Sequence, residues 1–185
     1  MKVEFHRDGD TQYSVHVHRR DGVVVSLPGA GGRWQVPHDL AHFATERALD
    51  MAGGVFGSMA AGAMFERMTV VSGRQRRDPK QRSQQVLRTN TRSRSITVAE
   101  TMTSLVHDAV HHGRSNDLIK RAHGLWGTVR EDAFPYTVQH FQTAIRDLRA
   151  LSEEWATTSA GSCLAVEWPD RLTTQLPAKP RPERR

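Results

Sequence analysis

Three stretches with β-strand patterning lie within the first 27 residues, and the links between them are short. Apolar residues alternate along residues 2–7 and 12–19, and a β-branched run marks residues 22–27. Parallel neighbours would need a crossover of a dozen or more residues, whereas Asp21 and Gly22 form a typical tight-turn pair. The sequence therefore begins with an expected antiparallel meander.

The rest of the chain is patterned mainly for helices, with one strand near its end. Helices are predicted over residues 38–51, 97–112, 115–122 and 137–158, the last from apolar residues spaced by three and four, and the small residues at 55–68 are compatible with a further helix. Strict alternation returns at 163–168, which we interpret as a strand that rejoins the N-terminal sheet. The predicted class is α+β, with a small antiparallel sheet of three N-terminal strands plus a C-terminal strand, packed with about four helices.

Positive charge is concentrated in one internal segment. Residues 74–94 hold eight basic residues and one acidic residue, a local net charge of +7 against +6 for the whole chain. Because the segment has almost no large apolar side chains, a basic linker is predicted over 74–95, either mobile or at most a solvated helix. This linker would join residues 1–73 to residues 96–170, which complete the same domain. A disordered basic tail is predicted over 171–185.

Composition favours a soluble globular protein, with 37% hydrophobic and 25% charged residues. The longest apolar-leaning stretch without charges, residues 51–65, falls short of the ~20 residues that span a bilayer, so no membrane partner is expected. The charged start of the chain does not resemble a signal peptide. The single cysteine, Cys163, excludes an internal disulfide and a multi-cysteine zinc site. A cytoplasmic location is expected.

Two histidine pairs share the spacing His-Asp-x-x-His, at His38 and His42 and again at His107 and His111. On a helix, residues four apart lie on one face and one turn apart, so both rings can reach one divalent ion. A known zinc-protease motif uses the same spacing, with Glu rather than Asp beside the first histidine. We therefore predict that these four histidines are metal ligands.

An acidic residue should complete the site. Glu46 lies four residues beyond His42 and so extends the first pair into a polar stripe along one helical face. Glu100 lies on the same helical face as the second pair but two turns before it, so Glu46 is the better candidate. Asp39 is the expected catalytic residue, either orienting a ligand histidine or activating water. The stripe lies away from the apolar side of its helix, so it should face a cleft or water. Imidazole and carboxylate ligands suit zinc, manganese, iron or nickel, and a hydrolase is the expected kind of enzyme.

The segment from Val36 to Glu46, followed by Gly54-Val55-Phe56-Gly57, resembles a group of uncharacterised bacterial proteins, especially from actinobacteria. Those proteins share a Pro-His-Asp-x-x-His-Phe/Tyr-x-x-Glu block and have no established activity. The resemblance covers about the first 75 residues and the closing strand, and it favours the first histidine pair. A weaker resemblance to His-Asp phosphohydrolases conflicts with the predicted sheet, because that family is all-helical.

Three alternatives stand beside the metal site. The histidines could belong to a solvated polar face, which is common for such short patterns. The chain could instead be a structural or interaction protein that packs through the apolar stripe between Val138 and Trp155. It could also bind nucleic acid through its basic segment, although no base-stacking aromatic residues interleave the charges. The residues expected to contact phosphates are Arg74, Arg76, Arg77, Lys80, Arg82 and Arg88.

Overall fold

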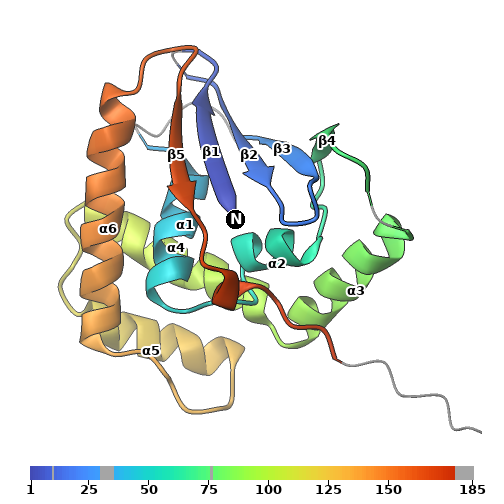
Figure 1. Ribbon diagram of the computed structural model, residues 1–185. Coiled ribbons are helices and arrows are strands. Elements are labelled where there is room, and N and C mark those ends of the chain that lie inside the picture. The colour runs from blue at the N-terminus through green and yellow to red at the C-terminus, as the bar shows by residue number, and fades with distance from the viewer. Residues whose placement is uncertain (10, 30–35, 76, 178–185) are drawn as a thin grey trace, which may run out of the picture.

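The computed structural model describes residues 1–9, 11–29, 36–75 and 77–177, and these form an α+β fold (Figure 1). The strands are β1 (Lys2–Arg7), β2 (Tyr13–His18), β3 (Val24–Pro28), β4 (Thr69–Ser72) and β5 (Cys163–Glu167). The helices are α1 (His38–Ala48), α2 (Val55–Ala61), α3 (Pro79–Arg92), α4 (Ser95–His111), α5 (Leu118–Val129), α6 (Val138–Thr157) and a short 3-10 turn η1 (Asp170–Leu172).

The sheet is antiparallel throughout, in the order β4-β3-β2-β1-β5. This confirms the predicted class, the N-terminal meander and the return of the last strand, which pairs Leu164 with Phe5 of β1. β4 was not expected from the sequence. All four of its residues are exposed, so its side chains do not show the alternation that marks a strand with one buried face.

The core is centred on α1, which packs between the sheet and helices α4 and α6 (Figure 1). The ring of Phe43 on α1 lies 6.2 Å from that of Phe5 on β1, 5.3 Å from Phe56 on α2 and 5.6 Å from Trp168. All four side chains are almost completely buried. The aromatic cluster therefore joins both ends of the chain to the central helix.

Two residues of the polar stripe of α1 are buried, contrary to the expectation that the stripe faces a cleft or water, whereas its first residue, His38, is partly buried and lines a pocket. His42 is 2% exposed and Glu46 is 0% exposed. A helical wheel shows only the pattern of one helix, and here α4 covers the side of α1 that the wheel marks as polar. These two residues are thus part of the interior.

Part of the basic segment, residues 79–92, forms the helix α3, and this helix is packed against the fold rather than mobile or fully solvated. Three of its side chains are buried, and Asn90 donates hydrogen bonds from Nδ2 to Ser58 Oγ at 2.7 Å and to Thr174 Oγ1 at 3.0 Å. Thr174 in turn donates to the Ala52 carbonyl at 2.7 Å. The start of the predicted tail is therefore packed against α2 and α3, whereas residues 178–185 lie outside the described residues.

Helix number and length also differ from expectation. The described residues contain six α-helices rather than about four. α2 ends at Ala61, well before residue 68, because Gly62 adopts φ 106° in the left-handed region. α5 extends to Val129 rather than to residue 122. Among the described residues, none of the helices combines the length and apolar character that a membrane crossing requires.

Candidate metal centre

The two predicted histidine pairs meet where α1 packs against α4. His38 and His42 lie on the first two turns of α1, which begins directly after Pro37, and their ring centroids are 4.8 Å apart. α4 brings Glu100 to them, with Oε2 3.1 Å from His42 Nε2. Within the described ranges, His38, His42 and Glu100 each offer one ligand atom, and these atoms lie within 4.8 Å of one another.

His42 is held between two carboxylates. Its Nδ1 lies 3.0 Å from Glu46 Oε1, on the opposite side of the ring from Glu100. Burial disfavours the charged ring, but the hydrogen bonds to Glu100 and Glu46 raise the pKa of His42 to about 10. A buried histidine with a carboxylate at each nitrogen is therefore either an imidazolium ion or a metal ligand whose other nitrogen is fixed by hydrogen bonding.

Glu46 holds the site together and does not join the group of possible ligands. Its carboxylate accepts hydrogen bonds from the backbone N–H of Val55 at 2.8 Å and of Phe56 at 3.0 Å, at the start of α2. These amides have no partner inside their own helix, so a carboxylate there stabilises the helix end. Glu46 was the predicted third ligand. The acid that lies next to His42 Nε2 is Glu100, because the oxygens of Glu46 are directed to α2 and to the Nδ1 side of His42.

The second histidine pair lies beside the first. The ring of His107 is 6.0 Å from that of His38 and 4.3 Å from that of His111. Burial, together with the neighbouring histidines, lowers the pKa of His107 to about 4 and also lowers the pKa of His111. The pKa of His38 is lowered mainly by burial. These three rings are therefore predominantly neutral near pH 7, the form in which imidazole binds metals.

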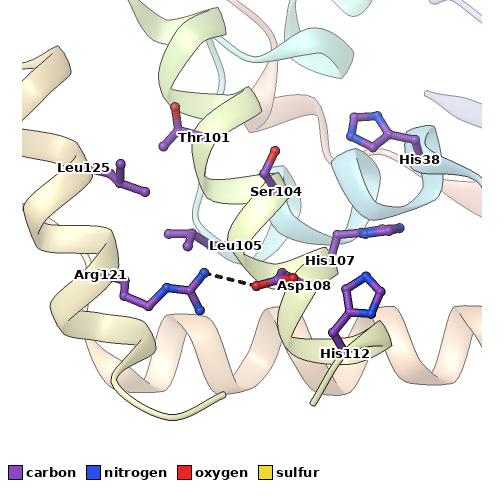
Figure 2. Close-up of a pocket in the computed structure, with 9 residues that line it drawn as sticks. All are labelled: His38, Thr101, Ser104, Leu105, His107, Asp108, His112, Arg121 and Leu125. Atoms are coloured by element: carbon purple, nitrogen blue, oxygen red, sulfur yellow. Dashed lines mark hydrogen bonds and ion pairs between the residues drawn. The ribbon is translucent and has the colours of Figure 1, made fainter. Parts of the chain in front are cut away.

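A pocket of about 580 Å³ opens next to these rings. Figure 2 shows His38 from α1 and His107 from α4 on one side of it, and Arg121 from α5 reaching Asp108, with a closest separation of 3.1 Å. The remaining lining residues are Thr101, Ser104, Leu105, His112 and Leu125. Since His38 belongs both to the ligand group and to the pocket wall, a metal ion at this group would adjoin a space that a small molecule can enter.

Asp39, the predicted catalytic residue, makes a different contact. Its Oδ2 accepts a hydrogen bond from Tyr13 Oη on β2 at 2.6 Å. This bond ties the first turn of α1 to the sheet, and Asp39 is not one of the residues that line the pocket. His38 and His107 line the pocket instead, and the sequence predicted both of them only as ligands.

The candidate nucleic-acid residues are distributed along and before α3. Arg82 already has a partner within the fold, because its Nε donates a hydrogen bond to the Ala61 carbonyl, at the end of α2, at 2.7 Å. Arg76 lies outside the described residues. The exposed residues of the set are Arg74, Arg77, Lys80, Arg82 and Arg88. Nucleic-acid binding by this segment stays a prediction.

Comparisons with protein-family models, with curated proteins and with solved structures found no match to this chain. The resemblance to an uncharacterised bacterial family therefore also stays a prediction.

Proposed function

We propose that this chain binds one divalent transition-metal ion at the α1–α4 site, through His38, His42 and Glu100, and uses it for hydrolysis. The observation that carries the proposal is His42, buried between Glu46 and Glu100 with His38 beside it. A polar ring so deeply buried needs a partner at each nitrogen. A metal ion would replace the hydrogen bond between Nε2 and Glu100, while Glu46 would keep the ring oriented through Nδ1.

The separations suit a metal centre of ordinary size. Two ligand atoms at about 2.0–2.1 Å from a tetrahedral zinc ion lie roughly 3.3 Å apart. His42 Nε2 and Glu100 Oε2 are 3.1 Å apart, so an ion between them requires only a small adjustment of two side chains. Glu100 can adjust readily because its side chain is 52% exposed. Imidazole and carboxylate ligands suit zinc, manganese, iron or nickel.

Hydrolysis follows from the number of ligands and from the pocket. Two histidines and one glutamate leave a coordination position open, as in catalytic rather than structural zinc sites. A metal ion there would supply a nucleophilic water at neutral pH. His107 lies beside His38 on the pocket wall, where its ring, neutral at pH 7 because its pKa is lowered, would accept a hydrogen bond from such a water but act only as a weak base.

The first test replaces Glu100 with Gln. Untagged, metal-free protein should take up zinc, and Glu100→Gln should weaken this binding by at least about 10–100-fold, the loss typical when groups around a metal are removed. Calorimetric titration together with elemental analysis would measure it. Glu154→Gln, which changes an exposed acid on α6, is the matched control and should bind as tightly as the unchanged protein. Equal affinity of the two variants would contradict the proposal.

The second test counts protons. Because the pKa of His42 is raised to about 10, the metal-free ring carries two protons at pH 7, and coordination through Nε2 must displace one of them. His38 and Glu100 contribute little, since the pKa of each is lowered. We expect release of about one proton per metal ion at pH 7, measured by calorimetry in buffers of different ionisation enthalpy. Release should fall toward zero above pH 10. Binding with no proton release at pH 7 would show that His42 is not a ligand.

A further inference from the structure

A second group of possible ligands lies on the face of the sheet that the helices leave open. Along β1, Val3 and Phe5 point into the core with 0% exposure, so the alternating residues Glu4 and His6 point to the opposite face. On β2, His16 is the register partner of Glu4 and therefore lies on the same face. Two adjacent strands thus place these three side chains together.

The geometry of this open-face cluster is compact. Glu4 Oε2 lies 3.3 Å from His6 Nε2 and 2.8 Å from His18 Nε2. The rings of His6 and His16 have centroids 4.2 Å apart, with planes inclined by 40°. Ligand atoms of Glu4, His6 and His16 all lie within 4.8 Å of one another. All three residues are only partly buried, so solvent reaches the cluster.

The Glu4 carboxylate is shared between Lys2 and the histidines. Lys2 Nζ lies 2.5 Å from Glu4 Oε1, so one oxygen is paired with an ammonium group and the other, Oε2, faces the histidines.

We infer that Glu4, His6 and His16 form a second, independent site for a divalent transition-metal ion, with His18 next to the carboxylate. Imidazole-rich ligand sets bind copper and nickel as well as zinc, and copper most strongly among these ions. The core residues Val3 and Phe5 separate this cluster from α1, so it shares no ligand with His38, His42 and Glu100. The two sites should fill without depending on each other.

Cys163 provides a reporter for this face alone. It is the only cysteine of the chain, it is exposed, and it pairs with His6 across β1 and β5. Directly opposed residues of antiparallel strands have Cβ atoms about 4.5–5.5 Å apart on the same face. A fluorophore attached to Cys163 would therefore sit beside the open-face cluster, and a bound Cu²⁺ ion there should quench it.

The experiment titrates Cu²⁺ into the labelled full-length chain. Quenching should saturate near one ion per chain, and His16→Ala should weaken the binding that causes it by at least about tenfold. Ser14→Ala is the matched control, because Ser14 lies on the same face as the register partner of His6 without joining the cluster. Circular dichroism would confirm that each variant is folded. Calorimetry of the unlabelled Cys163→Ser variant should show the same binding event, which excludes the thiol as the ligand.

The outcomes separate this site from the α1–α4 site. Glu100→Gln should leave the quenching unchanged, and His16→Ala should leave the binding event assigned to Glu100 unchanged. Unaltered quenching in folded His16→Ala would overturn the inference, as would loss of copper binding in Cys163→Ser. If only the α1–α4 site binds metal, the open-face site fails while the proposed function stands. If copper quenches the fluorophore but no binding depends on Glu100, the open-face site stands and the proposed function fails.

Discussion

Replacing Glu46 with Gln is expected to lower the free energy of unfolding by about 3–5 kcal/mol, the range for removing one partner of a buried charged pair. The Glu46 carboxylate accepts three hydrogen bonds, from His42 Nδ1 and from the amides of Val55 and Phe56. Glutamine keeps the size of the side chain. Its NH₂ group, however, is itself a donor, and it would stand where a carboxylate oxygen now accepts a hydrogen bond from an N–H group. One buried donor is then unsatisfied, and His42 loses a charged partner.

The comparison variant is Glu100→Gln, on the other side of the same histidine. Its side chain is 52% exposed, so solvent can compensate for the lost charge, and the expected loss is about 1 kcal/mol or less. Both variants should be unfolded with urea in the presence of a chelator, because bound metal would add its own stabilisation. Similar losses for the two variants would show that Glu46 is not the anchor that its contacts indicate.

Replacing Gly54 with Ala should also destabilise the protein, by about 1–3 kcal/mol as for other overpacked interiors. The backbone of Gly54, at φ −75°, is one that alanine adopts without strain. The difficulty is space, because an added Cβ would lie 2.5 Å from Glu46 Oε2. Either the carboxylate or the start of α2 must move, and both movements lengthen the bonds that hold Glu46. Thermal and urea unfolding would measure the loss.

Gly124→Ala is the matched control for that substitution. Gly124 lies inside α5, and nothing is found within 4 Å of the position where a Cβ would be added. Alanine there should raise the free energy of unfolding by about 0.5–1 kcal/mol, since glycine is unfavourable inside helices. Opposite signs for the two variants are expected. A neutral Gly54→Ala would mean that the contact between α2 and Glu46 is not tight. In that case the proposed orientation of His42 would lose its support.

Local patterns in the sequence accounted for much of the fold. The alternation along residues 2–7 and 12–19 predicted β1 and β2, and the three-and-four spacing at 137–158 predicted α6 almost to its ends. The return of β5 to β1 was also expected. The packing of the basic segment was not expected, because it depends on a few small contacts, such as Asn90 with Ser58, that carry no periodic signal.

The sequence by itself determined that His38 and His42 share one helical face, as do His107 and His111. This is because spacing by four is a property of the helix alone. Only the tertiary structure decided that the two faces meet, that His42 is buried, and which acid completes the group. Glu46 was the natural choice by local spacing, yet its oxygens bind α2. Glu100, 58 residues from His42, occupies the place instead, because the packing of α4 against α1 sets that distance.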